Sequence, residues 1–156
     1  MKKLITFLAI TSILFACQPK NRVYVENQKL SPDTEWLKKD VREFKVPIDD
    51  IDMVYNLSVS FRYANGYQYP TANVKVTETS PSGKETVANY ELKVRKANGD
   101  YIGEAGYDIW DSEHLVEPNK KYTEKGTYTY KIEQNTPVDP LPFAMEIGLI
   151  LDKSTN

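Results

Sequence analysis

The chain has 156 residues, a formal net charge of −2 at pH 7 and a mean hydropathy of −0.54. Its 20 basic residues are scattered among 22 acidic ones, so the sequence shows no basic patch of the kind that nucleic-acid binding requires. A single cysteine and a single histidine exclude an internal disulfide, a thiol redox pair and a zinc site with several cysteine or histidine ligands. We therefore expect no cofactor and no nucleic-acid partner.

The first 16 residues have the parts of a bacterial lipoprotein signal peptide. Lys2 and Lys3 form a basic start, and the apolar run LITFLAITSILFA follows. This run is too short to hold the chain as a membrane-spanning helix. It leads into Leu-Phe-Ala-Cys, which is similar to a lipobox, so we predict that cleavage exposes Cys17 for attachment of palmitate or similar acyl chains. The alternative is an ordinary secretory signal with a chance cysteine.

The sequence divides after this signal into a tether and one domain. We assign residues 17–22 to the lipidated cysteine with a short polar tether and residues 23–156 to a single folded domain. Two or more acyl chains hold a protein stably on a membrane, because each buried methylene contributes about 0.8 kcal/mol. Gln18 stands where an aspartate would retain a lipoprotein in the inner membrane, and basic rather than acidic residues follow it. We expect a periplasm-facing protein anchored in the outer membrane.

Alternating apolar and polar residues, the period of a half-buried strand, dominate the rest of the chain. The clearest example is residues 55–63, and further strands are predicted at residues 23–28, 41–48, 74–77, 90–95, 101–109, 127–133 and 143–151. Residues 31–35 read either as a plain turn or as the capped start of a short helix. About eight strands without helical periodicity predict an all-β fold, an antiparallel β-sandwich of the immunoglobulin-like or jelly-roll-like kind.

Turn residues separate these strands. Asn65-Gly66 and Asn98-Gly99 predict tight hairpins, because both residue types tolerate positive φ, and Pro81-Ser82-Gly83 predicts a turn for a similar reason. The stretch from Glu124 to Tyr128 resembles the approach to a tyrosine corner, in which a tyrosine hydroxyl bonds to the preceding backbone.

The stretch GEAGYDIWDSEH, from Gly103 to His114, is the most chemically suggestive part of the sequence. A glycosidase needs two carboxyl groups about 5 to 9.5 Å apart, whereas Asp108 and Asp111 would point to opposite faces of a strand. The acidic spacing does not follow a calcium loop, and the chain has no G-x-S-x-G elbow. The sequence therefore predicts neither catalysis nor a metal site here. Gly103 and Gly106 predict a bulged or closely approached strand.

Aromatic residues offer a second kind of site. Tyr67 and Tyr69 follow the Asn65-Gly66 turn, and Tyr107 and Trp110 flank Asp108. Such rings can stack on a sugar or grip a partner protein, and they can equally belong to the core.

The sequence resembles the GldH family of gliding-motility lipoproteins over nearly the whole mature chain. The matching residues of the first half are Arg22-Val23-Tyr24, Trp36, Lys38-Lys39-Asp40, Phe44, Pro47, Tyr55-Asn56-Leu57, Arg62, Tyr67, Tyr69-Pro70 and Asn73. Those of the second half are Ser80-Pro81, Gly83, Tyr90, Gly99, Gly103, Gly106, Asp108-Ile109-Trp110-Asp111, Gly126, Tyr128 and Ile147-Gly148-Leu149. The family's members are lipoproteins of Bacteroidota associated with gliding and type IX secretion, and they are not known as enzymes.

The resemblance implies a non-catalytic assembly or scaffold component that docks with other envelope proteins of the gliding and secretion apparatus. Tyr107, Asp108, Trp110 and Asp111 are then interface or turn residues. The alternative is a carbohydrate-binding envelope lipoprotein that uses Tyr67, Tyr69 or Trp110 as a stacking platform. A hydrolase acting through Asp108 and Asp111 is a third reading. The sequence predicts neither the direct partner nor the oligomeric state.

Overall fold

The computed structural model describes residues 21–154, and this part of the chain is all-β, as predicted. The predicted signal peptide and Cys17 lie outside the described residues. Residues 21–154 form eleven strands instead of about eight, and three of these strands have only two residues. The strands are β1 (Arg22–Lys29), β2 (Glu35–Trp36), β3 (Arg42–Ile48), β4 (Tyr55–Ala64), β5 (Thr71–Thr79), β6 (Glu85–Lys93), β7 (Glu104–Ala105), β8 (Ile109–Lys120), β9 (Gly126–Gln134), β10 (Leu141–Pro142) and β11 (Ala144–Lys153).

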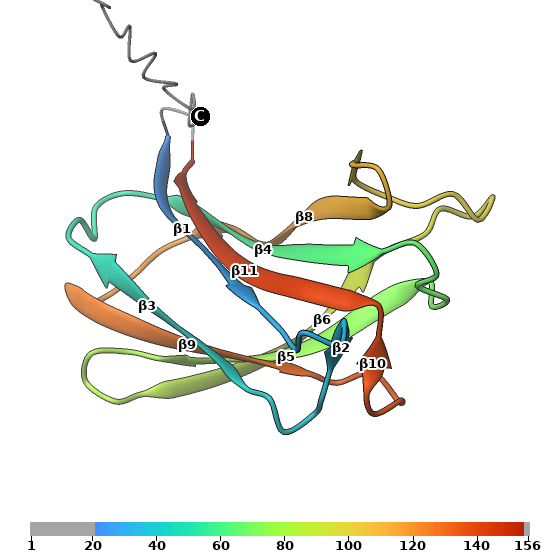
Figure 1. Cartoon of the computed structure of the whole chain (residues 1–156). Helices are drawn as coiled ribbons and strands as arrows, with labels where there is room; N and C mark the ends of the chain where they lie inside the picture. The colour runs from blue at the N-terminus through green and yellow to red at the C-terminus, as the bar shows by residue number, and fades with distance from the viewer. Residues whose placement is uncertain (1–20, 155–156) are drawn as a thin grey trace, which may run out of the picture.

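Two antiparallel sheets form the layers of a sandwich. The five-stranded sheet has the order β1-β11-β4-β8-β7, and the four-stranded sheet has the order β3-β9-β5-β6. Figure 1 shows the first sheet above the second, with the small β10-β2 pair beside them. The first strand begins at Arg22, which the sequence had assigned to the tether.

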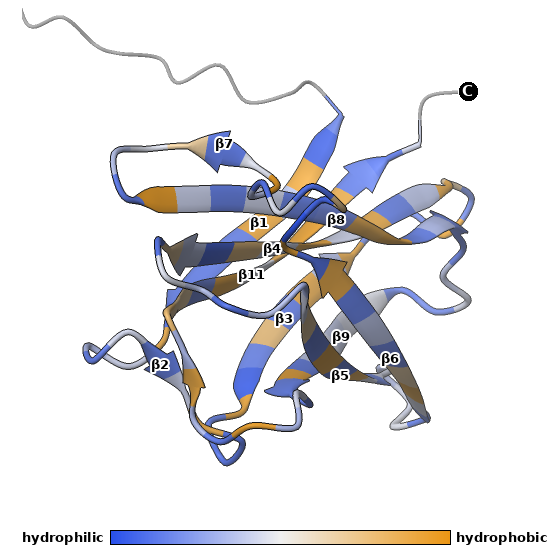
Figure 2. Cartoon of the chain, turned by 90° about the vertical axis from the view of Figure 1, so that its right-hand side faces the viewer, coloured by the Kyte–Doolittle hydropathy of each residue, from blue (hydrophilic) through white to orange (hydrophobic). Residues whose placement is uncertain are grey.

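The core lies between these sheets because one side of each strand is apolar. Along β4 the residues Leu57, Val59 and Phe61 are at most 1% exposed, and Val46 of β3 and Ile132 of β9 face them from the other sheet with no exposure. Figure 2 shows the resulting alternation of apolar and polar bands along the strands. The hydrophobic effect of burying such side chains, roughly 25 cal/mol per Å² of apolar surface, is the main force that holds the layers together.

Two local predictions need correction. Residues 101–109 do not form a strand: apart from a single bridge at Tyr101 and the two residues of β7, the segment turns back on itself, and the strand is β8, which begins only at Ile109. The alternation of apolar and polar residues did not reveal β8, because both sides of this strand carry polar residues, with Ser112 and His114 on the inner side. The Asn65-Gly66 turn does not close a hairpin either, since the chain crosses there from β4 in one sheet to β5 in the other.

Other turn predictions are confirmed. Pro81-Ser82-Gly83 lies in the turn that joins β5 to β6, and Asn98-Gly99 closes a small hairpin bridged between Arg95 and Tyr101. Residues 31–35 contain a turn, and no helix occurs anywhere between residues 21 and 154. The Tyr128 hydroxyl accepts a hydrogen bond of 3.2 Å from the Glu124 N–H, the backbone contact expected of a tyrosine corner.

The sandwich has two distinct ends. At the tether end, Asn21 lies beside Lys153, and Tyr55 pairs with both Lys153 and Lys120. At the far end, Tyr63 pairs with Ala144 and Trp110. Ten residues of β4 connect the two ends, a span of roughly 30 Å. Within the described residues, no helix has the length and apolarity to cross a membrane.

A charged cluster joins the two sheets at the tether end. The Lys120 ammonium lies 2.6 Å from carboxylate oxygens of Glu78 in β5 and Glu117 in β8. Burial by itself lowers the pKa of Lys120, but the hydrogen bonds to the two glutamates outweigh it and raise that pKa, so the ammonium stays charged.

Candidate functional site

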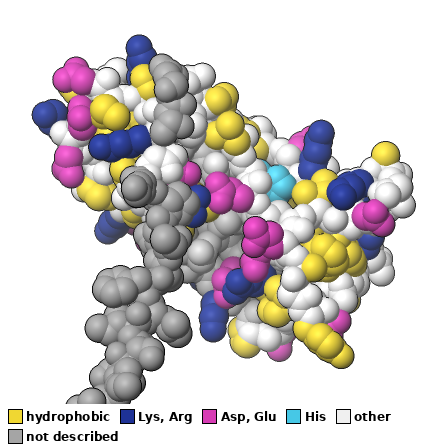
Figure 3. Space-filling model, turned by 90° about the horizontal axis from the view of Figure 1, so that it is seen from above, with side chains coloured by type: hydrophobic (Ala, Val, Ile, Leu, Met, Phe, Trp, Pro, Cys, Tyr) yellow, Lys and Arg dark blue, Asp and Glu magenta, His cyan; other side chains and the backbone are white. Residues whose placement is uncertain are grey.

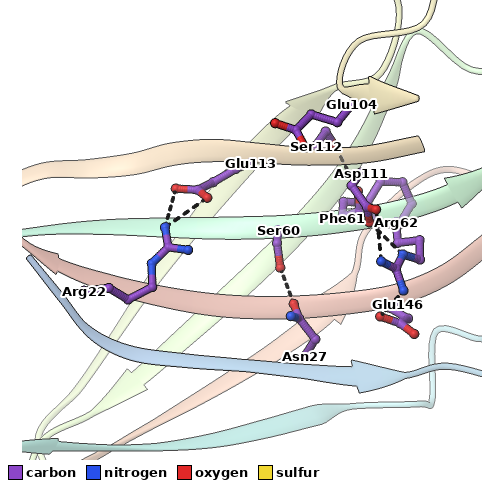
Figure 4. Close-up of a pocket in the computed structure, with 10 residues that line it drawn as sticks. All are labelled: Arg22, Asn27, Ser60, Phe61, Arg62, Glu104, Asp111, Ser112, Glu113 and Glu146. Atoms are coloured by element: carbon purple, nitrogen blue, oxygen red, sulfur yellow. Dashed lines mark hydrogen bonds and ion pairs between the residues drawn. The ribbon is translucent and has the colours of Figure 1, made fainter. Parts of the chain in front are cut away.

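The outer face of the five-stranded sheet contains a groove of about 440 Å³, which we call the outer groove. Figure 4 shows that its polar side chains rise from β1, β4, β7, β8 and β11 and converge on one hollow. Seen from above in Figure 3, acidic and basic side chains lie next to one another on this face of the molecule. The lining residues are Arg22, Asn27, Ser60, Phe61, Arg62, Glu104, Asp111, Ser112, Glu113 and Glu146.

Gly148 has no side chain, and this leaves space on the floor of the outer groove for side chains of the two neighbouring strands. Gly148 pairs with Asn27 of β1 on one side and with Ser60 of β4 on the other, and the Ser60 hydroxyl donates a 2.6 Å hydrogen bond to Asn27 Oδ1 across it. A Cβ atom on Gly148 would overlap both of these side-chain oxygens and lie 2.7 Å from the Glu26 carbonyl oxygen. The glycine therefore permits a hydrogen bond that spans three strands.

Arg62 organises one side of the outer groove. Its Nε lies 2.6 Å from Asp111 Oδ1, its Nη2 donates to Asp111 Oδ2 at 2.9 Å, and its Nη1 lies 3.1 Å from Glu146 Oε2. The hydrogen bond with Asp111 is the largest cause of the raised pKa of the Arg62 guanidinium. The bidentate pair with Asp111 of β8 and the additional bond to Glu146 of β11 hold the planar guanidinium of Arg62 in one orientation.

Arg22 repeats this arrangement nearer the tether end. Its Nε lies 3.1 Å from Asp152 Oδ1, and its Nη2 lies 3.2 Å from Glu113 Oε2. Hydrogen bonding to Asp152 raises the pKa of Arg22 above its ordinary value. The outer groove thus combines two guanidinium groups with the carboxylates of Glu104, Asp111, Glu113 and Glu146, which leaves it with a net charge of −2.

An apolar hollow of about 430 Å³ adjoins the outer groove. Both hollows are lined by Arg62 and Glu146, so the two lie side by side on the same sheet face. The apolar residues that line this hollow are Leu30, Pro32, Ile109 and Met145, and Lys29, Ser31 and Thr34 line it as well. Met145 sits in β11 at the irregularity between Ala144 and Glu146, where it has no residue opposite it on β4.

The Gly103–Asp111 segment borders the outer groove at the far end. Gly103 has a φ of 130°, and a Cβ there would overlap the Asp111 carbonyl, so the predicted close approach is confirmed. Asn65 holds the other side of the segment: its amide nitrogen donates to Asp108 Oδ1 at 2.8 Å, and its Oδ1 accepts from Trp110 Nε1 at 2.8 Å. The loop between β7 and β8 carries Tyr107, which is 100% exposed.

The aromatic residues singled out in the sequence have different environments. Tyr67 is 0% exposed and its hydroxyl donates to the Thr71 carbonyl, so it belongs to the core and we do not retain it as a surface contact. Tyr69 is half-buried and meets Tyr67 edge to face at 78°. Trp110 is half-buried against Tyr101, with the ring centroids 5.2 Å apart. These rings do not share a flat exposed face on which a sugar could stack.

The two aspartates proposed as a catalytic pair are engaged separately. Asp108 is bonded to the Asn65 amide, while Asp111 is bound by Arg62 at the outer groove. Among the residues that the structure describes, no group of three His, Cys, Asp or Glu side chains is placed to hold a metal ion. The arrangement of paired charges and fixed hydrogen bonds suits the recognition of a polar partner.

His114 lies on the same side of β8 as Ser112, opposite Val59 of β4. Its Nε2 is 3.0 Å from the Ser112 hydroxyl, which itself donates to the Phe61 carbonyl, so the ring supplies the hydrogen from Nε2. Burial lowers the pKa of His114, and the ring is therefore neutral near pH 7.

Sequence reasoning found Asp111 but missed its surroundings. Arg22, Asn27, Arg62, Glu113 and Glu146 had not been selected as site residues, although Arg22 and Arg62 are among those that carry the family resemblance. Arg62 lies 49 residues from Asp111 and 84 residues from Glu146 along the chain. Only the strand order brings them together, and no local pattern in the sequence reports that order.

The fold and the site define a β-sandwich protein with a charged groove on one outer face. The family model described as GldH lipoprotein matches residues 22–151, nearly the whole described part. The chain therefore belongs to the GldH lipoprotein family. The names of its relatives associate this family with gliding motility.

Two relatives support this assignment. A protein of Christiangramia forsetii named gliding motility lipoprotein GldH homolog is 30% identical over 153 residues, covering 94% of this chain and 93% of the relative. The gliding motility lipoprotein GldH of Flavobacterium johnsoniae is 30% identical over 122 residues, covering 78% of this chain and 74% of the relative. Both names describe lipoproteins of gliding motility.

Proposed function

We propose that this protein is a non-catalytic lipoprotein that docks with other envelope proteins as an assembly or scaffold component of the gliding-motility machinery and the associated type IX secretion system. The observation that carries the proposal is the outer groove, where Arg22 and Arg62 each bind two carboxylates across strands of one rigid sheet. Side chains fixed in this way present a constant pattern of charge and hydrogen-bonding groups, which lowers the entropic cost of binding a partner. The relatives' association with gliding motility supports the machinery named here.

The same proposal places the protein on the outer membrane, facing the periplasm, with acyl chains on Cys17 and residues 23–156 as its single domain. Cys17 precedes Arg22, the first residue of β1, by only five positions, which limits the tether to roughly 18 Å at full extension. The tether end must then stay near the bilayer. The far end, with Tyr107 and the Gly103–Asp111 segment, is directed away from the membrane, where envelope proteins are within reach.

Crosslinking followed by purification tests the docking role. The full-length lipoprotein, carrying an affinity tag after Asn156, is crosslinked in intact cells and purified from the envelope under denaturing conditions. We expect gliding or type IX secretion components among the adducts. Adducts free of any such component would contradict the proposal.

Protease treatment tests the placement. Protease added to intact cells should not cleave the protein, whereas protease added to cells with a permeabilised outer membrane should cleave it. Cleavage in intact cells would show that the domain faces the exterior.

A further inference from the structure

We infer that the outer groove and the apolar hollow together receive an extended polypeptide segment that carries one basic side chain close to one apolar side chain. The inference rests on the proposed docking role and names the chemistry of the partner segment. The two hollows share Arg62 and Glu146 and lie on one sheet face, so a single ligand can fill both.

Charge selects the basic side chain. Each arginine of the outer groove is already bound by two carboxylates, Arg62 by Asp111 and Glu146 and Arg22 by Asp152 and Glu113. Glu104 is exposed at the rim and forms no ion pair with any residue from 21 to 154. The outer groove carries a net charge of −2, or −1 when Lys29 of the adjoining hollow is counted, so it repels an anion and attracts a lysine or arginine, which can pair with Glu104 and with the exposed side of Glu113.

The neighbouring hollow selects the apolar side chain. Pro32, Ile109 and Met145 leave apolar surface beside the charges, with buried Leu30 beneath them. The flexible thioether of Met145 can adapt to the shape of an aliphatic guest. Alternate side chains of an extended chain point the same way about 7 Å apart, so a Lys-x-Leu sequence presents a basic and an apolar side chain on one face of the ligand.

The same lining argues against a sugar. Sugar-binding surfaces expose aromatic rings for stacking, whereas the aromatic residue of the outer groove, Phe61, is 1% exposed and faces the core. A polypeptide also supplies backbone N–H and C=O groups for the polar floor at Asn27 and Ser60.

Two methionines allow a direct test on the acylated protein in nanodiscs of zwitterionic lipid. Met145 lines the apolar hollow, whereas Met53 precedes β4 at the tether end and serves as an internal control. With ¹³C-methyl methionine labels, the peptide acetyl-Gly-Lys-Gly-Leu-Gly-amide should shift the Met145 signal and leave the Met53 signal in place. Replacing lysine by glutamate turns attraction into repulsion, and replacing leucine by serine removes the buried apolar group, so each change should weaken the response about fivefold or more.

A matched pair of variants locates the lysine contact. Glu104→Gln should weaken binding of the lysine peptide, while Glu91→Gln, at an exposed glutamate of β6 in the other sheet, should not. Equal shifts at Met53 and Met145, an equal response to the glutamate peptide, or no response to any peptide would overturn the inference. Spermidine binding as well as the peptide would show a small-cation site and would also overturn it. If envelope adducts are recovered but no peptide binds, the docking role stands and this assignment of partner chemistry fails.

Discussion

The outer faces of the two sheets are both polar, but they use their charges differently. On the four-stranded sheet, Lys75 pairs with Glu133 directly across from it at 2.6 Å, and Lys45 reaches only Glu43 of its own strand at 3.9 Å. On the five-stranded sheet, Arg62 joins β4 to both β8 and β11, and Arg22 joins β1 to both β11 and β8. The first face is an ordinary solvated surface, whereas the second is an ordered one.

The ordered face of the five-stranded sheet is the better candidate for a binding surface. Isolated surface ion pairs contribute about 0–1 kcal/mol and cost side-chain entropy, so they are weak evidence of selection for anything but solubility. Networks that cross several strands, above a glycine that leaves room for a hydrogen bond, hold side chains in one arrangement. A fixed arrangement is what a binding surface needs.

The largest predicted effect concerns the floor of the outer groove. Gly148→Ala places a methyl group against Asn27, Ser60 and the Glu26 carbonyl, and we expect a loss of about 3 kcal/mol of unfolding free energy from overpacking and the broken Asn27–Ser60 bond. Lys131→Ala, at an exposed residue of β9 in the other sheet, is the control and should change stability by about 0.5 kcal/mol or less. Urea unfolding monitored by tryptophan fluorescence measures both; equal losses would contradict the role of Gly148.

An intermediate effect separates the two faces. Arg62→Ala removes a cation bound by two carboxylates at a side chain that is 38% exposed, so screening limits the loss to about 1 kcal/mol. Lys75→Ala on the other sheet should cost about 0.5 kcal/mol or less. A double-mutant cycle between Arg62 and Asp111 should show coupling greater than that between Lys75 and Glu133. Equal coupling would remove the distinction between the faces.

The smallest effect concerns the reverse side of β8. The folded state lowers the pKa of His114 below its ordinary value near 6.5, so the folded protein binds fewer protons there than the unfolded chain. Its contribution to stability is present above pH 6.5 and is lost as the pH falls through and below that value. His114→Asn should therefore reduce the slope of stability against pH between 7 and 5. An unchanged slope, measured by urea unfolding at several pH values, would show that the ring is not buried as described.

Much of the architecture was accessible from the sequence. The alternation along residues 55–63 predicted β4 correctly because one side of that strand packs in the core and the other meets water. β8 was missed because Asp111 and Glu113 alternate with Ser112 and His114, which are themselves polar although they face inward. The Asn65-Gly66 pair correctly predicted a turn. Turn residues do not indicate whether the next strand belongs to the same sheet, so the crossing from β4 to β5 was not predicted.

The site was less accessible than the fold. Asp111 was selected from the sequence, but its neighbours Arg62 and Glu146 were not. These residues are far apart in the sequence and come together only through the strand order β11-β4-β8. Tyr67 was selected as a surface ring and is buried, because residues 65–70 cross between the sheets and carry its side chain into the core. Strand order and the route of a crossing are set by the packing of the whole domain.

Photo-crosslinking in living cells tests most directly whether the ordered face is the one that docks. Benzoylphenylalanine replaces Tyr107, the fully exposed residue of the Gly103–Asp111 segment that borders the outer groove, or, at an exposed position on the other sheet, Glu91. We predict a discrete adduct with a gliding or secretion component from position 107 and none from position 91. Adducts from position 91 alone, or equally from both positions, would contradict the assignment of the docking surface to the five-stranded sheet.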